Sequence, residues 1–210
     1  MTKLWNAMRT RRVLAIVIGV LLVGGIGTSA AVFVPGLVGP AQPAKAANVG
    51  TPPGATPGGF TEFSSQQAGF ALSYPTAWSK LAAKDPQVLL LVSQGPQDSF
   101  LVRALELPEP VTAQQLPAAK QVTDQIVASN KTAKMITEPK QIELGGLPGF
   151  FYFYSFQDPT TGQEGAHSHF FLFNGKTMLS LVFQSLPKDH FASTAPTFDQ
   201  ITSSFHVLKK

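Results

Sequence analysis

The sequence predicts an α+β fold in which helices cover an antiparallel β-sheet, preceded by one N-terminal transmembrane helix. Three observations lead to this prediction. Apolar runs at strand spacing are joined by turns rich in Gly and Pro, only two segments show helical spacing, and a long uncharged run follows a basic start. Hairpins interrupted by only two helices favour an antiparallel sheet over a doubly wound parallel one.

The uncharged run at residues 13–34 is long enough to cross a bilayer as a helix. At about 1.5 Å per residue it reaches the roughly 30 Å of a hydrocarbon core. The preceding segment, residues 1–12, carries only basic charges: Lys3, Arg9, Arg11 and Arg12. This pattern favours a cytoplasmic N-terminus and an extracytoplasmic remainder. We therefore expect a single-pass protein of the cytoplasmic membrane.

A cleaved secretory signal is the alternative, because small residues near Ala31 and Ala46 fit signal-peptidase sites. The apolar run continues past Ala31 to Val34, which is longer than a signal core needs. The chain has no cysteine, so a lipidated cysteine cannot anchor it. We expect a retained signal anchor, with secretion after cleavage as the other outcome.

The chain beyond the anchor divides into a tether and one domain. Residues 35–59 are rich in Pro, Gly and Ala, which predicts a flexible tether, and residues 60–210 have the length of a single domain. The first 59 residues hold five Lys or Arg and no acidic residue, whereas the remainder holds 11 basic and 12 acidic residues. The net charge of +4 therefore comes from the first 59 residues, whose basic start sets the orientation in the membrane. We expect no nucleic-acid partner, because the domain lacks the polybasic surface that phosphates require.

The first half of the domain is predicted as strands followed by one helix. Extended structure is expected from Phe60 to the turn forced by Pro75. The apolar runs 87–93 and 99–107 predict a β-hairpin with a loop of about five residues. Residues 113–129 have apolar side chains at helical spacing, so they predict an amphipathic helix.

The limits of that helix follow from its flanking residues. Thr112 and Gln115 have capping-box spacing, and Asn130 is expected near the end. Pro117 leaves open a start at that residue, because proline is favoured in the first helical turn.

The second half is predicted as a meander of strands, then a helix and a last strand. Extended segments are expected at 135–137 and 140–144, a turn at 145–149, and aromatic-rich strands at 150–156, 166–173 and 176–184. Asn174-Gly175 is a strong hairpin signal between the last two. Residues 187–204 have helical spacing that we expect Pro196 to break, before a final strand at 205–208.

Several short motifs in this order resemble the PsbP-like family, which includes the photosystem II extrinsic protein and small exported bacterial proteins. They are GFALSYPTAW at 69–78, ELGGLPGFFYFYSF at 143–156 and FDQITSSFHV at 198–207. The resemblance covers about residues 60–210. It implies an α/β/α sandwich and a role as an accessory or docking domain on a larger assembly. It brings no set of catalytic residues.

Two pairs of side chains are candidate site residues. His167 and His169 alternate on one predicted strand, so both imidazoles face the same side and are candidate metal ligands. A metal site needs a third ligand, for which the candidates are His190, His206, Glu164 and Asp158. The alternative is that the pair consists of ordinary polar residues on the outer face of a sheet.

The aromatic strand at 150–156 offers the second pair, Tyr152 and Tyr154, as a partner or ligand surface. Alternation places both tyrosines on one face and Phe151 and Phe153 on the other. A central strand covered on both faces has the same pattern, and the exposure of the two tyrosines distinguishes these interpretations.

Three functional hypotheses follow. The first is a non-enzymatic accessory protein, without a cofactor, that docks on a membrane or cell-envelope protein complex. The second is a carrier or binding protein for an apolar or lipid ligand. The third is a metal-dependent enzyme that uses His167 and His169. A serine hydrolase is not expected, because no G-x-S-x-G motif occurs.

Overall fold

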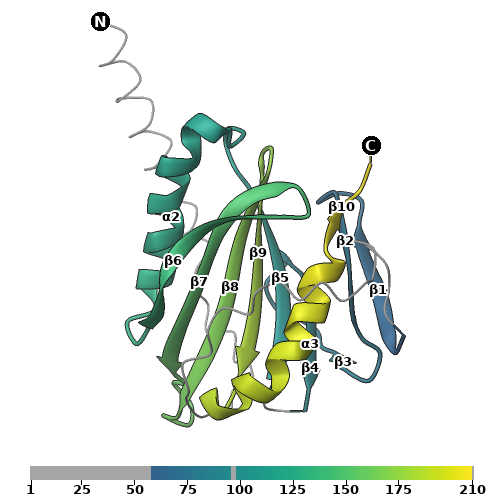
Figure 1. Ribbon diagram of the computed structural model, residues 1–210, viewed down its shortest axis with the longest axis vertical. Helices are drawn as coiled ribbons and strands as arrows, with labels where there is room; N and C mark the ends of the chain where they lie inside the picture. Colours follow the sequence, from purple (N-terminus) through teal and green to yellow (C-terminus); the bar gives the residue numbers. More distant parts are fainter. Residues whose placement is uncertain (1–57, 96–97, 210) are drawn as a thin grey trace, which may run out of the picture.

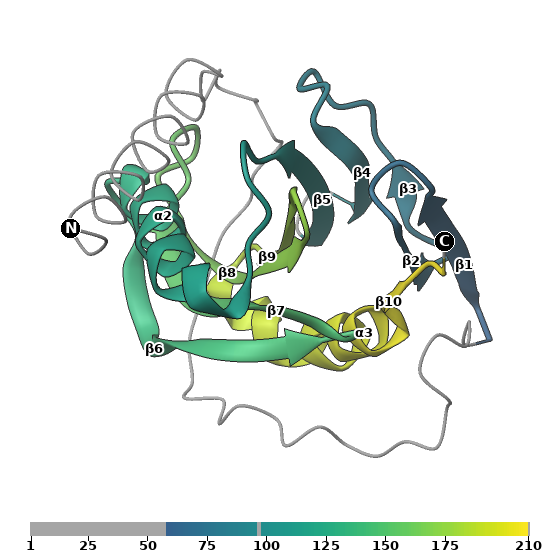
Figure 2. The same cartoon turned by 90° about the horizontal axis from the view of Figure 1, so that it is seen from above.

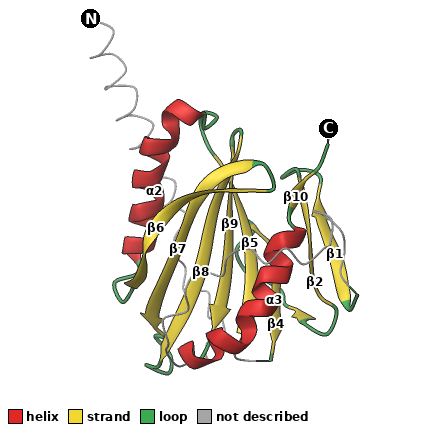
Figure 3. Cartoon of the chain, viewed as in Figure 1, coloured by secondary structure: helices red, strands yellow, loops and turns green. Residues whose placement is uncertain are grey.

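The computed structural model describes residues 58–95 and 98–209, which fold into two antiparallel sheets and two α-helices (Figure 1). Strand is the main structure of this part of the chain (Figure 3). The predicted basic segment, the anchor at 13–34 and the tether up to residue 57 lie outside the described residues. Within the described ranges, every helix is too short or too polar to span a membrane.

The larger sheet has seven strands in the order β3-β4-β5-β9-β8-β7-β6. The strands are β3 (Ser79–Lys80), β4 (Val88–Gln94), β5 (Asp98–Glu106), β6 (Lys134–Leu144), β7 (Leu147–Gln157), β8 (Glu164–Asn174) and β9 (Thr177–Ser185). Both predicted hairpins are confirmed, since β4 pairs with β5, and β7, β8 and β9 form an antiparallel meander. β5 and β9 are neighbours in the sheet but are not consecutive in the sequence. After β5 the chain therefore leaves the sheet, and it returns as β6 at the far edge.

A second, three-stranded sheet joins the two ends of the domain. It consists of β1 (Phe60–Ser65), β2 (Phe70–Pro75) and β10 (His206–Val207), with β2 in the middle. The sequence predicts these strands but not that they form a separate sheet. Its formation depends on pairing between residues near positions 70 and 206, which no local pattern encodes.

The predicted helices are present and cover opposite faces of the larger sheet. The 3₁₀ turn η1 (Ala113–Gln115) leads into α2 (Leu116–Ser129), and η2 (Lys188–His190) leads into α3 (Phe191–Ser204). The Gln115 side chain accepts a hydrogen bond from the Thr112 amide at 2.8 Å, so the predicted cap forms before the 3₁₀ turn. From above, α2 lies on one side of the molecule and the small sheet on the other (Figure 2).

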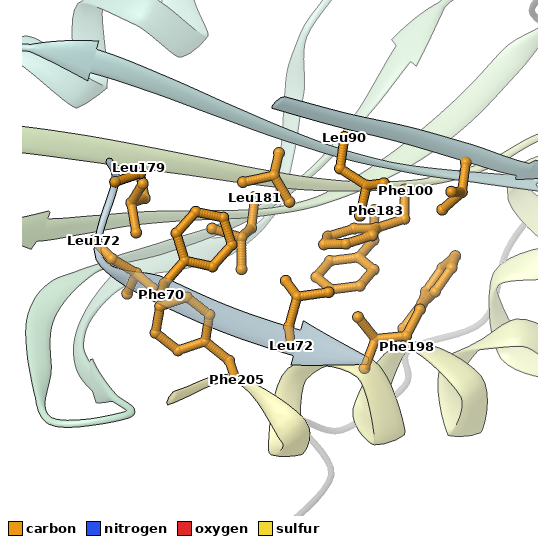
Figure 4. Close-up of a cluster of buried hydrophobic side chains, with 14 of the residues drawn as sticks. Phe70, Leu72, Leu90, Phe100, Leu172, Leu179, Leu181, Phe183, Phe198 and Phe205 are labelled. Carbon is orange, nitrogen blue, oxygen red and sulfur yellow. The ribbon is translucent and has the colours of Figure 1, made fainter. Parts of the chain in front are cut away.

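Apolar side chains fill the spaces between the larger sheet and the elements that cover its two faces. Residues of α2 pack against Phe150, Tyr152, Phe171 and Phe173 on one face of β7 and β8. On the other face, β2 and α3 pack against the centre of the larger sheet, and the side chains involved are Phe70, Leu72, Phe100, Leu181, Phe183 and Phe198 (Figure 4). The central strands are therefore covered on both faces, which explains their nearly continuous apolar sequence.

The prediction that Pro196 breaks the last helix is wrong. Residues 191–204 form one continuous α-helix that contains Pro196. Proline removes an amide that would bond to the carbonyl four residues earlier, here that of Ala192. Ala192 and Pro196 are both exposed, so water can satisfy that carbonyl and the cost of the proline is reduced.

The predicted turn at 145–149 is also too long, because β7 begins at Leu147. Pro148 pairs with Glu143 of β6, whereas pairing with β8 begins only at Gly149, so Pro148 needs no amide on that side. A Cβ atom at Gly149 would lie 2.1 Å from the Phe171 carbonyl oxygen. Glycine is therefore required at this position.

Candidate functional site

The two candidate histidines lie on β8 between a tyrosine on β7 and polar residues on β9. His167 is opposite Tyr154 and Gln184, and His169 is opposite Tyr152 and Val182. Nδ1 of each imidazole lies 3.2 Å from the Tyr154 hydroxyl. The prediction that both rings lie on the same face of the strand is confirmed by this shared partner.

The remaining ring nitrogens bond to β9. His167 Nε2 lies 2.9 Å from Gln184 Oε1, and His169 Nε2 lies 2.7 Å from Ser180 Oγ. We refer to Ser180, His169, Tyr154, His167 and Gln184 as the histidine row. It crosses three adjacent strands of the sheet on the face that α2 partly covers.

One direction of hydrogen bonding satisfies the whole row. Gln184 Oε1 can only accept, so His167 carries its proton on Nε2 and its Nδ1 accepts from the Tyr154 hydroxyl. The Tyr154 oxygen then accepts from His169 Nδ1–H, and His169 Nε2 accepts from the Ser180 hydroxyl. In this arrangement both imidazoles are neutral and have opposite tautomers.

Burial keeps both histidines in the neutral form. Desolvation lowers the pKa of His167 to about 4, and the bond to Gln184 opposes this shift only in part. The pKa of His169 is well below its usual range, first because of desolvation and then because of the nearby His167 and Arg103. Desolvation also raises the pKa of Tyr154, which stays a neutral hydroxyl.

No third ligand joins the two histidines in the described part of the chain, where no group of three or more His, Cys, Asp or Glu side chains is placed to hold a metal. The four candidates have other partners. His190 faces Asp98, His206 contacts the Ser204 carbonyl, Glu164 pairs with Lys188, and Asp158 accepts hydrogen bonds from its own loop. The assignment of His167 and His169 as metal ligands stays a prediction, and all four of their ring nitrogens already have partners.

The tyrosines of the predicted partner surface lie under α2. Tyr152 is 1% exposed and Tyr154 is 5% exposed, so neither ring forms part of the molecular surface. The Tyr152 hydroxyl donates to Asp124 Oδ1 at 2.7 Å and also contacts Thr123, both on α2. The burial favours the interpretation of a covered central strand, and a role for these tyrosines in binding a partner or ligand stays a prediction.

Sequence reasoning missed the polar residues of β9. Neither Ser180 nor Gln184 is singled out by a motif in the sequence. Residues 180 and 184 are four apart on β9, so their side chains lie on one face of the strand. This is the face of the sheet on which the two imidazoles lie, because Gln184 is opposite His167. Alternation next to a histidine pair is the signal that could have identified them.

Tyr154→Phe is expected to destabilise the domain by about 1–3 kcal/mol, because it leaves the Nδ1 atoms of both histidines without their shared buried partner. Urea unfolding of the variant and the wild type measures this difference. Tyr74→Phe on β2 is the matched control, with an expected change within about 0.5 kcal/mol. Equal effects of the two substitutions would contradict a structural role of the row.

The fold defines the class of protein, which is an antiparallel α+β domain. The buried polar residues of its histidine row bond to one another. The PsbP family model matches residues 58–207, and the chain belongs to the PsbP family. No curated protein sequence matches the chain. Membership of this family is consistent with an accessory or binding protein.

Two solved structures show the same fold. Cyanobacterial PsbP (CyanoP) from Synechocystis sp. PCC 6803 is 20% identical with a TM-score of 0.56, and the match covers 76% of this chain and 98% of that one. LpqN, described as involved in cell envelope biogenesis of Mycobacterium tuberculosis, is 10% identical with a TM-score of 0.54, and the match covers 71% of this chain and 86% of that one. At these identities the likeness establishes the fold alone.

Proposed function

We propose that this chain is a non-enzymatic accessory protein whose PsbP domain docks on a membrane or cell-envelope protein complex. Residues 13–34 anchor it in the cytoplasmic membrane, and residues 35–59 tether the domain on the extracytoplasmic side. The chain lacks cysteine, so acylation of a cysteine cannot supply the attachment.

The observation that carries this proposal is the saturation of the candidate site. The histidine row uses all four imidazole nitrogens in hydrogen bonds within the domain. Its side chains therefore link three strands of the sheet inside the domain, and either imidazole could bind a metal only by giving up a partner within the row. Family membership supports a binding role, and the description of LpqN supports a setting in the cell envelope.

Crosslinking of the full-length chain in native membranes, followed by mass spectrometry, tests the proposal. We expect a small, reproducible set of membrane or envelope proteins to be crosslinked to residues 58–209. The matched control replaces residues 1–46 with a cleaved secretory signal, so that the same domain is exported without the anchor. We expect this control to recover the same partners at lower yield, because the tether raises the effective concentration of the domain at the membrane.

Two results would contradict the proposal. One is recovery of the full-length chain in the soluble exported fraction without a protein partner. The other is a set of crosslinked proteins that depends only on the N-terminal segment and is lost entirely when that segment is replaced.

A further inference from the structure

The helix α2 covers only part of its face of the larger sheet. It lies beside β7 and β8, away from β4 (Figure 2). Of β5 and β9 it covers one end, at Leu105 and Met178. In the described part of the chain, no residue of β3 or β4 belongs to the buried cluster under α2. We refer to this face of β3, β4, β5 and the far part of β9 as the open half.

Four aliphatic side chains cross the open half in one line. Leu81 directly follows β3, and its amide donates to the Leu91 carbonyl of β4 at 2.9 Å. Leu91 is opposite Leu101 of β5, which in turn is opposite Val182 of β9. Residues opposite each other on neighbouring strands point to the same side of a sheet. We refer to these four residues as the aliphatic row.

The aliphatic row lies outside the buried core. Residues next to it along the strands, such as Val92, Phe100 and Leu181, point to the other face and are buried. Leu81 is 42% exposed, and the other three members of the row are partly exposed. All four are absent from both core clusters of the described residues. Adjacent aliphatic side chains left at the surface are typical of an interaction site.

The side chains that flank the aliphatic row on the same strands are uncharged or paired. On one side of it lies a line of uncharged residues that are opposite one another in the sheet: Ser79, Ser93, Ser99 and Gln184. On the other side, Arg103 forms an ion pair with Asp85. An apolar centre depleted of charge is typical of contacts between identical subunits. Because its flanking charges are paired, the open half does not repel a second copy of itself.

We propose that the aliphatic row is the contact between two copies of this chain, whose larger sheets stack face to face. With a two-fold axis that runs along the strands between β4 and β5, Leu91 faces Leu101 of the second copy, and Leu81 faces Val182 of the second copy. The uncharged line from Ser79 to Gln184 then faces its own reverse, so hydroxyl and amide groups meet across the contact. Stacked sheets lie about 10 Å apart, a space that aliphatic side chains fill.

The size of the open half predicts a weak dimer. Four strands about 4.8 Å apart, with the nine residues of β5 at about 3.3 Å each, give a projected area of roughly 500 Å². Two copies therefore bury roughly 1,000 Å² together, which is at the lower limit for a specific interface. We expect an association that depends on concentration, and crosslinking of a single site can capture it.

Single-cysteine crosslinking of the full-length chain in intact cells tests this contact, because the chain has no cysteine of its own. Leu91→Cys places one thiol beside the two-fold axis, and a short bis-maleimide is the probe. Gln125→Cys is the matched control, since Gln125 is exposed on α2, outside the open half. We expect about tenfold more crosslinked homodimer for Leu91→Cys than for the control, because specific pairing raises the effective concentration of the two thiols.

A second substitution shows whether the aliphatic row itself makes the contact. Leu81→Lys, added to the Leu91→Cys chain, should reduce the homodimer to the level of the control, because the dimer would bury a charge without a partner. Leu81 is exposed at the edge of the sheet, so we expect the domain to keep its fold.

Three results would overturn the proposed dimer. They are a Leu91→Cys chain that yields only monomer, a homodimer that Leu81→Lys does not reduce, and a crosslink from Leu91→Cys to a different protein. The last result would still support docking on a protein complex, whereas a homodimer forms with or without such a complex. The two proposals can therefore fail separately.

Discussion

Phe183→Ala is expected to lower the free energy of unfolding by about 3–5 kcal/mol, the range for truncation of a fully buried phenylalanine. Phe183 is fully buried, and its ring stacks on Phe100 of β5 at a centroid distance of 4.5 Å. It also contacts Phe198 of α3, with centroids 5.0 Å apart. Truncation therefore removes the contacts of this ring with Phe100 and Phe198 and leaves a cavity that rigid neighbours cannot close.

Urea unfolding of the full-length chain, followed by tryptophan fluorescence in a Trp5→Phe background so that Trp78 gives the signal, measures this effect. Trp78 is buried in the same cluster, with its ring 6.2 Å from that of Phe198. Phe151→Ala on β7 is the matched control, because this phenylalanine is only half-buried and should cost clearly less. Comparable losses in the two variants would show that the core between the two sheets does not dominate stability.

Acidification is expected to destabilise the domain through the histidine row. In an unfolded chain an imidazole has a pKa near 6.5, whereas that of His167 is lowered to about 4 in the folded domain. Between these values the unfolded state binds more protons than the folded state, so stability falls as the pH falls from about 6.5 towards 4. For His167 alone the loss is about 2 kcal/mol at pH 5, and His169 shifts in the same direction.

The urea midpoint at about pH 7.5 and at about pH 5 measures this dependence. We expect a clearly lower midpoint at the acidic pH for the wild type. The double variant His167→Gln, His169→Gln should lose most of the difference, whereas His206→Gln should keep it. A wild-type midpoint that is the same at both pH values would mean that the imidazoles are protonated in the folded domain without cost.

The hairpin between β8 and β9 shows how far sequence reasoning extends to the site. Asn174-Gly175 predicts the hairpin, and alternation predicts one face for both histidines. In the structure the loop residues are Gly175 and Lys176, and Asn174 pairs with Thr177. A loop at residues 174–175 would place His167 opposite residue 182 instead of Gln184. The face of the strand is therefore predictable, whereas its partner depends on which two residues form the turn.

Tyr152 and Tyr154 illustrate a second limit of predicting the site from the sequence. The pattern of 150–156 is equally compatible with a covered central strand and with an exposed aromatic face, because both place aromatic residues on two sides. The position of α2 over β7 decides between them and buries Tyr152 and Tyr154. Packing of a helix onto a sheet involves residues far apart in the chain, which no periodicity within one segment can show.

The sequence by itself determined the two helices, most of the strands and their order, the antiparallel fold class, the PsbP family and the location of the positive charge ahead of the domain. These features depend on local spacing, turn residues and composition. The tertiary structure decided the separate small sheet, the partners of His167 and His169, and the pairing of Asp98 with His190. Each of these depends on contacts between distant segments, whose register and packing are fixed only when the whole core assembles.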